Sequence, residues 1–305
     1  MRIANPIYDV VFKRLMENER VVKFFIGTLL DEEVITVSLK PQEYTITKEA
    51  KLPATITIAA LTIYRVDFVA TIRLKDGSYK KVLIEIQKAH NKVDLMRFRN
   101  YLADQYKKKD EVAGRKVALP ITTIYILGFN LPHIESACVT IDRQYRDRMK
   151  NKTLDVKEEF IELLTHDCHI VQVNRIDSRY QTRLDKLLSL FEQSYFINEI
   201  QTLKNYEHTI DDQDVATMAD ILHYLSSDAK ARELLDKEAE ANRTIDEWFG
   251  EQSEIIARQA QALEQKDELL EQKDELLTEQ AQALEEKERL IAELLRKLEQ
   301  KDENA

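Results

Sequence analysis

The sequence predicts a mixed α/β core, in which helices flank a central mixed sheet, followed by a helical region and a long C-terminal helix. Three observations predict this fold class. Residues 121–129 form a near-continuous apolar run, which is typical of a buried central strand. Apolar residues alternate with polar ones on both sides of Lys75-Asp76-Gly77, which indicates an antiparallel hairpin. The heptapeptide EQKDELL occurs twice in succession from Glu264, which indicates a long helix.

The composition excludes several protein classes. The chain has 305 residues, and because 44% of them are hydrophobic it can bury a core and is not wholly disordered. Five glycines and five prolines exclude a collagen-like or low-complexity chain. Two cysteines, Cys138 and Cys168, are too few for a disulfide scaffold or a four-cysteine zinc site. We therefore expect reduced thiols in a cytoplasmic protein.

No segment of the sequence predicts a membrane partner. The longest apolar-leaning run, residues 54–64, is short and rich in threonine, so it does not span a bilayer. The first ten residues carry Asp9 and lack the apolar segment of a secretory signal.

The net charge of −10 is unevenly distributed. Residues 1–130 contain 22 Lys and Arg against 15 Asp and Glu, which gives +7. Residues 131–250 give −9, and residues 251–305 give −8. Arguments about partners therefore apply to segments of the chain, and the first segment is compatible with binding an anionic polymer.

The first segment alternates helix and strand. An apolar pattern at helical spacing after Pro6 predicts one helix or a pair of helices ending near Leu30. Residues rich in Val, Ile and Thr predict strands at 34–39 and 54–62. The hairpin adds strands at 64–74 and 80–87, and a helix at 93–109 precedes the buried strand.

The middle of the chain is less distinctive. Strands are predicted at 139–146 and 169–173, with a short helix at 156–165 between them. Further helices are predicted at about 183–192, 214–225 and 229–240. We place domain boundaries so that the core is 1–175, the helical region 176–243 and the long helix 244–305.

The C-terminal segment repeats every seven residues. Its apolar positions are Leu263, Leu270, Leu277, Leu284, Ile291 and Leu298. A two-stranded coiled coil also needs apolar companions three and four positions away, and Asp267 and Asp274 are charged instead. The narrow stripe predicts weak or partner-dependent association of the chain into a homo-oligomer. The alternative is a solvated charged helix.

The hairpin register follows from its alternation. The apolar residues of both strands must lie on one sheet face, so the numbers of paired residues add to an even number. A three-residue loop, with Gly77 in the left-handed region, meets this condition and pairs Leu74 with Ser78. This register sets Asp67 opposite Glu85, with Gln87 on the same face.

Two carboxylates about 5 Å apart on a buried sheet repel each other, so they cost stability. A hard divalent cation such as Mg²⁺ removes this cost, because it binds carboxylate oxygens while keeping several waters. Such a site suits metal-assisted hydrolysis of a phosphodiester. The alternative is a plain strand in which Asp67 and Glu85 are solvent-facing surface residues.

The motifs, taken in order, resemble the PD-(D/E)xK nuclease superfamily and, within it, the recombination-promoting nuclease / transposase branch. The resemblance covers residues 1 to about 175. An early D-x-x-F-K motif is present as Asp9, Phe12 and Lys13, and E-x-Q is present as Glu85-Ile86-Gln87. An aromatic and basic helix follows the hairpin. Val66 stands where the superfamily has proline, and Gln87 stands where it has lysine.

The resemblance implies a restriction-endonuclease-like core and a Mg²⁺- or Mn²⁺-dependent DNA endonuclease linked to recombination or mobile elements. Asp67 and Glu85 match the metal ligands, and the Ile86 carbonyl would be a third. Gln87 matches the catalytic residue that orients the attacking water, although a neutral amide cannot compensate charge. Asp9 would add a catalytic contact to the metal or to water, or is an ordinary acid at a helix start.

Five residues are candidates for contact with DNA: Lys13, Arg65, Lys88, Arg97 and Tyr101. Lys88 reaches the site only if its strand ends or bulges there, because alternation points it away. Arg97 and Tyr101 lie four apart on one helical face, where they contact phosphate or simply belong to an amphipathic helix. The run 107–109, all lysine, fits steering of a DNA backbone and equally a solvated helix end.

The remaining motifs carry weaker signals. The run from His166 to His169 contains two histidines, an aspartate and a cysteine, but its spacing matches no common zinc pattern. The five glycines stand apart, so no phosphate-binding glycine loop exists. The second hypothesis for function is a catalytically degenerate nucleic-acid-binding or coiled-coil interaction protein.

Overall fold

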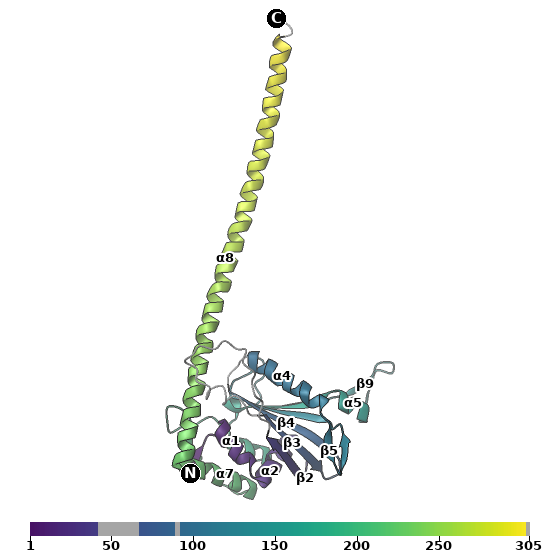
Figure 1. Ribbon diagram of the computed structural model, residues 1–305, viewed down its shortest axis with the longest axis vertical. Coiled ribbons are helices and arrows are strands. Elements are labelled where there is room, and N and C mark those ends of the chain that lie inside the picture. Colours follow the sequence, from purple (N-terminus) through teal and green to yellow (C-terminus); the bar gives the residue numbers. More distant parts are fainter. Residues whose placement is uncertain (42–66, 89–91, 303–305) are drawn as a thin grey trace. The chain divides into compact units, whose positions relative to one another are not determined.

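The computed structural model describes residues 1–41, 67–88 and 92–302 (Figure 1). The chain divides into two compact units, Met1–Arg243 and Thr244–Ala305. The predicted core and helical region thus lie together in the first unit, and the second unit begins where the long tail was predicted to begin.

The first unit is built on a six-stranded mixed sheet, which confirms the predicted α/β class. Its order is β2-β3-β4-β7-β11-β8. Three antiparallel strands come first, and β7 and β11 then continue parallel to β4, with β8 antiparallel at the far edge. The strands are β2 (Val34–Pro41), β3 (Asp67–Leu74), β4 (Tyr79–Gln87), β7 (Ile121–Leu127), β11 (His166–Gln172) and β8 (Cys138–Ile141).

Within the described residues, three two-stranded sheets accompany the central one. Strand β1 pairs with β12 and so joins the N-terminus to residues two hundred positions later. The pairs are β1 (Arg2–Ala4) with β12 (Leu203–Asn205), β5 (Asp110–Val112) with β6 (Arg115–Val117), and β9 (Tyr145–Asp147) with β10 (Lys152–Leu154). The single strand predicted at 139–146 is therefore two strands, β8 and β9, in different sheets.

The helices follow the predicted pattern with one difference. The described helices are α1 (Asp9–Met16), α2 (Glu19–Leu30), α4 (Lys92–Lys107), α5 (Glu159–Leu164), η1 (Val173–Arg175), α6 (Arg183–Ser189), α7 (Gln213–Ser227) and α8 (Ala229–Asp302). The first predicted helix is a pair, because the Asn18 side chain accepts hydrogen bonds from the Arg20 and Val21 amides and starts a new helix. The difference is that the helix predicted at 229–240 and the long helix predicted at 244–305 are one helix, α8. The strand predicted at 54–62 lies outside the described residues.

The larger core lies between the sheet and helices α1, α2, α6 and α7. Phe12 is fully buried at its centre, and its ring lies 5.5 Å from the rings of both Phe25 and Phe68 in edge-to-face geometry. Phe191 adds a third ring at 6.5 Å. Aromatic rings in this geometry add attraction beyond the burial of their area. Phe12 therefore ties α1 to α2, to β3 and to the segment after α6.

Helix α4 covers the opposite face of the sheet (Figure 1). A small second core lies beneath it, formed by Val69, Leu83, Tyr101 and Ile121. Lys81, on the same face of β4 as Leu83, is also buried, and it forms an ion pair with Asp110 at 2.6 Å. Its ammonium also donates to the Gln105 carbonyl at 3.2 Å, near the C-terminal end of α4, where the helix dipole favours a cation.

None of the helices formed by the described residues combines the length and the apolar character that a membrane crossing requires.

The aromatic cluster predicts a large stability effect at Phe12. We expect Phe12→Ala to lower the free energy of unfolding by about 3–5 kcal/mol, because it removes a fully buried ring and leaves a cavity. Chemical denaturation measures the change. Phe160→Ala is the matched control, because the Phe160 side chain is 68% exposed and the same substitution there should cost little. Equal effects of the two substitutions would contradict this account of the core.

Candidate functional site

The turn between β3 and β4 is the predicted three-residue loop. The Leu74 amide donates to the Ser78 carbonyl at 2.9 Å, and the Gly77 amide donates to the Leu74 carbonyl at 3.0 Å. Gly77 has a φ of 88°, in the region where residues with a Cβ are strained. The Asp76 carboxylate accepts from the Ser78 amide and fixes the far side of the loop. The loop therefore sets the register of the hairpin.

This register pairs Asp67 with Glu85, as the alternation predicts. On β4, Leu83, Glu85 and Gln87 share the face beneath α4, since successive residues of a strand point to opposite faces. Glu85 is 2% exposed, so the solvent-facing alternative is excluded for this residue. Burying a carboxylate costs free energy unless other groups stabilise its charge. Glu85 is therefore a buried acid on the face of β4 beneath α4.

The structure describes three of the predicted site residues incompletely or not at all. The backbone of Asp67 is described at the start of β3, and that of Arg97 within α4. The side chains of these two residues, and the whole of Arg65, lie outside the described residues.

Helix α4 packs closely over the Glu85 position. The Phe98 ring lies 4.4 Å from the ring of Tyr125, which is the residue paired with Glu85 on β7. Tyr101 is 4% exposed and belongs to the small core with Leu83. Tyr101 is therefore a packing residue, and its predicted role in contacting DNA is corrected: the apolar side of α4 faces the sheet, and Tyr101 lies on that side.

Gln87 and Lys88, at the end of β4, lie close to the end of β7 and to the segment before α1. The Gln87 carbonyl accepts a hydrogen bond from the Gly128 amide at 2.8 Å, and Gln87 is half-buried. A Cβ on Gly128 would lie 2.8 Å from the Lys88 carbonyl and 3.0 Å from the side chain of Ile7. The chain therefore needs glycine at position 128 to hold the ends of β4 and β7 together. The Ile86 side chain packs against the larger core.

Lys88 lies on the opposite face from Glu85, where alternation predicts it. Its ammonium lies 3.1 Å from the centre of the Tyr8 ring and 3.6 Å from the Glu238 carboxylate. A cation over an aromatic face is attracted to it. Lys88 thus joins the end of β4 to the start of α1.

Asp9 is the first residue of α1 and is largely buried. Its carboxylate forms an ion pair with Lys13 at 2.7 Å, one helical turn later, and the Asp9 side chain is 15% exposed. Among the described residues, its buried oxygen Oδ1 has no hydrogen-bond partner. The pKa of Asp9 is raised to about 7, mainly by burial and also by the nearby Glu238 carboxylate, while Lys13 and Lys88 act to lower it. Asp9 can therefore exchange a proton near neutral pH.

Glu238 was not predicted, and it is central to this arrangement. It comes from the first part of α8, is 5% exposed, and accepts hydrogen bonds from the amides of Asp9 at 2.8 Å and Val10 at 3.0 Å. These amides are at the N-terminus of α1, where a negative charge is favoured. No local signal marks Glu238, because it is one acid among many in a helix far along the sequence.

Of the three residues of the D-x-x-F-K motif, one packs in the core and two belong to the candidate site. Phe12 is a core residue, and Asp9 lies at the end of β4 next to Lys88. The Lys13 side chain is 48% exposed and is held by Asp9, so it remains accessible to a phosphate. Asp9 and Lys13 are one helical turn apart and form an ion pair, while Phe12 is fully buried in the larger core.

The residues from His166 to His169 take part in local contacts. Asp167 accepts from the Arg143 guanidinium at 2.9 Å, and the His169 ring is 3.2 Å from the Thr140 hydroxyl. Within the residues whose side chains the structure describes, no group of three or more His, Cys, Asp or Glu could hold a metal. The Asp67 side chain is outside that set.

The site therefore has two parts at the end of β4. Glu85, with Asp67 opposite it in register, lies under α4, and Asp9, Lys88 and Glu238 lie at the α1 side. A pair of acids beneath a helix can bind a hard cation. The second part supplies a cation and a carboxyl that changes charge near neutral pH.

The raised pKa of Asp9 predicts a pH effect on stability. The folded chain binds the proton of the Asp9 carboxyl more tightly than the unfolded chain does. The protonated carboxyl therefore contributes its full stabilisation below the ordinary carboxyl pKa, and this stabilisation is lost as pH rises through about 7. Asp9→Asn removes the titration. Between about pH 5 and pH 8 the variant should gain stability relative to the parent by on the order of 1–4 kcal/mol.

Chemical denaturation in the presence of a chelator measures this difference. Asp142→Asn, at an exposed position, is the matched control and should leave the pH dependence unchanged. A stability difference between Asp9→Asn and the parent that stays constant over this range would show that Asp9 is not the group responsible.

Comparisons of the chain with protein-family models, with curated proteins and with solved structures found no match. The arrangement of residues at the end of β4 is therefore the basis for any functional assignment.

Proposed function

We propose that this chain is a Mg²⁺-dependent DNA endonuclease with a restriction-endonuclease-like core. The single observation that carries the proposal is the β3–β4 register, which sets Asp67 opposite a Glu85 that is 2% exposed. Two acids in this relation repel each other, and the resulting cost is relieved by a divalent cation. The resemblance to the recombination-promoting nuclease / transposase branch supports a link to recombination or mobile elements.

In this proposal Mg²⁺ or Mn²⁺, when bound, activates a water and stabilises the negative charge on the scissile phosphate. Asp67 and Glu85 would hold the ion, and the Ile86 carbonyl would be a further ligand. Gln87, two residues after Glu85 on the same face, orients the attacking water through its amide. The neutral Gln87 supplies no positive charge.

The α1 side of the site has a supporting role. Glu238 holds Lys88 and the start of α1, including the Asp9 amide, at the end of β4. In this proposal Lys13, whose side chain is 48% exposed, contacts a phosphate of the DNA. We therefore assign Asp9 to organising this end of the site and to accepting a proton near neutral pH.

Substitution of Glu85 tests the proposal. Glu85→Gln should lower Mg²⁺-dependent cleavage of duplex DNA by more than about 100-fold, since loss of even a residue behind a metal ligand costs roughly 10–100-fold. Asp67→Asn should act in the same way. A cleavage assay with and without chelator measures the effect, and circular dichroism checks that the variants are folded.

The matched control is Glu111→Gln, an exposed carboxylate of β5. It should cleave as the parent does. If the parent cleaves no DNA in Mg²⁺ or Mn²⁺, or if Glu85→Gln retains cleavage while folded, the endonuclease proposal fails. Binding of DNA without cleavage would favour the alternative, a catalytically degenerate nucleic-acid-binding protein.

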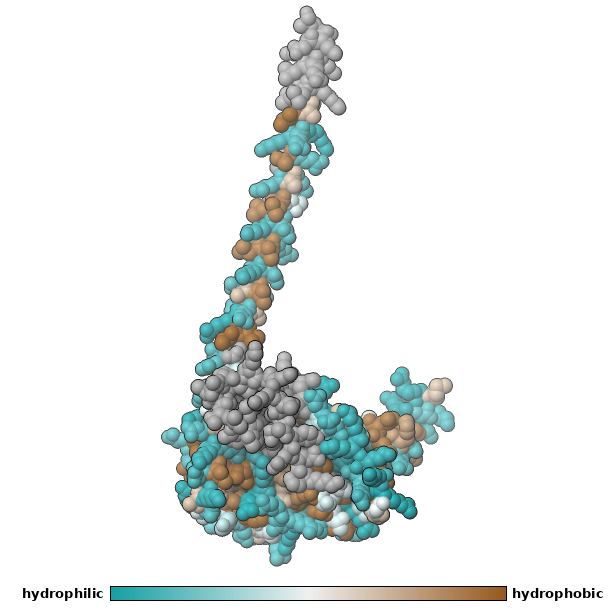
Figure 2. All heavy atoms as spheres, viewed as in Figure 1, coloured by the Kyte–Doolittle hydropathy of each residue, from teal (hydrophilic) through white to brown (hydrophobic). Residues whose placement is uncertain are grey.

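The second unit favours an added role in self-association. Apolar residues that recur every seven positions along it are between 57% and 62% exposed, at Leu270, Leu277, Leu284 and Ile291. Figure 2 shows hydrophobic residues at intervals along the surface of this helix. A straight helix drifts by about 20° per seven residues, so a strict seven-residue repeat keeps facing a partner only if two helices supercoil. We propose that the tail pairs with a second copy in a coiled coil.

Shortening the chain tests this role. A chain ending at Gly250 retains Leu235, Glu238 and Ala239, which are buried in the first unit, so it should fold. It should sediment as a monomer, whereas the full chain should be larger. In the full chain, Leu270→Gln with Leu277→Gln should act like the truncation, and Glu268→Gln with Glu275→Gln, off the apolar stripe, should not. An unchanged oligomeric state after truncation would show that the tail is not the site of assembly.

A further inference from the structure

The hairpin of β9 and β10 projects beyond the edge of the six-stranded sheet (Figure 1). We name residues 145–154 the basic arm. It contains four cations and one anion: Arg146, Arg148, Lys150, Lys152 and Asp147. All four cationic side chains are exposed. The arm therefore carries a net charge of +3 in a segment of the chain, residues 131–250, that is acidic overall.

Met149 stands at the tip of the basic arm and is 95% exposed. Two other methionines of the first unit, Met16 and Met218, are buried in the larger core. An apolar side chain held almost wholly in water at the end of a charged hairpin gains nothing for the fold. The Met149 side chain is therefore accessible to a binding partner.

The turn that presents Met149 is fixed by its own hydrogen bonds. The Asp147 carboxylate accepts from the amides of Met149 at 2.9 Å and Lys150 at 3.0 Å. Asn151 has a φ of 50°, and its side chain accepts from the Arg146 guanidinium. The tip is therefore preorganised, which lowers the entropy lost on binding.

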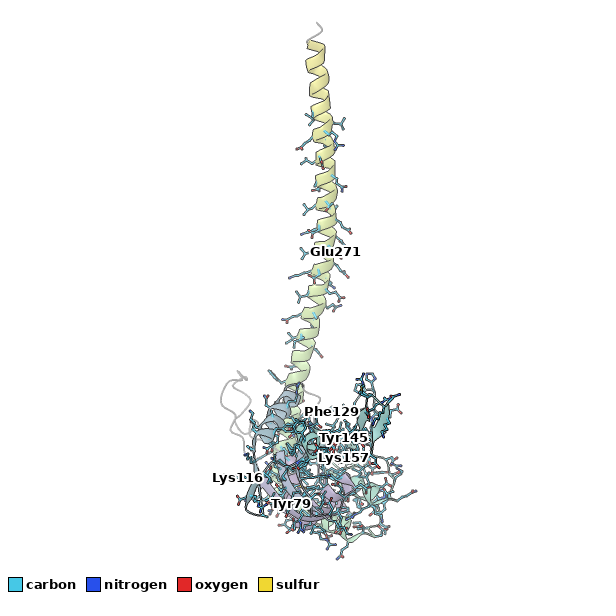
Figure 3. The ribbon with its side chains drawn as sticks, turned by 90° about the vertical axis from the view of Figure 1, so that its right-hand side faces the viewer. Tyr79, Lys116, Phe129, Tyr145, Lys157 and Glu271 are labelled. Atoms are coloured by element: carbon cyan, nitrogen blue, oxygen red, sulfur yellow. The ribbon has the colours of Figure 1, made fainter. Side chains whose placement is uncertain are left out.

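The base of the arm is anchored to the central sheet. Tyr145 donates to Glu162 of α5, and the Arg143 guanidinium donates to Glu162 at 2.7 Å and to Asp167 of β11 at 2.9 Å. The Lys157 ammonium lies 5.7 Å from the Tyr145 ring, and Figure 3 shows these two side chains close together. The base of the arm is thus fixed to α5 and to β11 of the central sheet.

We infer that the basic arm grips duplex DNA, with Met149 as an apolar wedge between two base pairs in the minor groove. Arginine and lysine on both strands of the hairpin match the phosphates on either side of a groove. Proteins that bend DNA insert side chains such as methionine or leucine between base steps and unstack them. The inference rests on the proposed function, because it takes DNA as the substrate, and it adds a second contact region outside the Glu85 site.

The experiment uses the full chain, a fluorescein-labelled DNA duplex and Ca²⁺ in place of Mg²⁺, so that binding is measured without cleavage. Arg148→Gln with Lys150→Gln should weaken DNA binding about tenfold. It should also make the dependence of the binding constant on salt concentration less steep, by the amount expected for the loss of about two phosphate contacts. Lys266→Gln with Lys273→Gln removes the same charge from exposed positions of the tail and is the matched control. It should bind as the parent does.

A duplex that contains 2-aminopurine reports unstacking of a base step. The parent should raise its fluorescence, Met149→Ala should lose that signal, and Met149→Leu should keep it, because leucine also serves as a wedge. If the arm variants bind and unstack DNA as the parent does, the inference is overturned. It is also overturned if their only defect is on vesicles of anionic lipid.

The outcomes separate this inference from the endonuclease proposal. Arm-dependent binding in a parent that cleaves nothing in Mg²⁺ would uphold the arm and reject the endonuclease. If Glu85→Gln abolishes cleavage while the arm variants bind DNA normally, only the inference about the basic arm is rejected.

Discussion

The hairpin register of β3 and β4 is the constraint on which the rest of the first unit depends. Gly77 in a left-handed conformation closes a three-residue loop, and this loop decides which residues of the two strands stand opposite each other. A shift of one residue would exchange the two faces of the strands. The apolar residues would then meet water, and Glu85 would no longer stand opposite Asp67 under α4.

The two faces of the sheet differ in what they bury. The face toward α1 and α2 carries the larger core, with Phe12 at its centre, and it supplies most of the apolar burial. The face toward α4 has a smaller core and holds buried charged groups, Lys81 and Glu85. Charged groups are costly to bury, so they are tolerated where another face provides the stability.

The end of β4 depends on a contact between distant parts of the chain. Glu238 binds the first amides of α1 and lies near Lys88, so α8 takes part in shaping the site through its first turns. The same pattern holds for the basic arm, where Arg143 connects α5 to β11. Polar groups far apart in sequence thus set the orientation of both proposed DNA-contacting regions.

The sequence by itself determined the α/β class, the hairpin register, the opposition of Asp67 and Glu85, and the long tail helix, because alternation, turn chemistry and seven-residue repeats are local patterns. The tertiary structure alone decided that Tyr101 is buried, that Glu238 meets Asp9, and that Met149 is exposed. These outcomes depend on which surfaces meet after folding. An aromatic residue at helical spacing or an acid in an acidic helix has the same local pattern in either environment, so only packing distinguishes them.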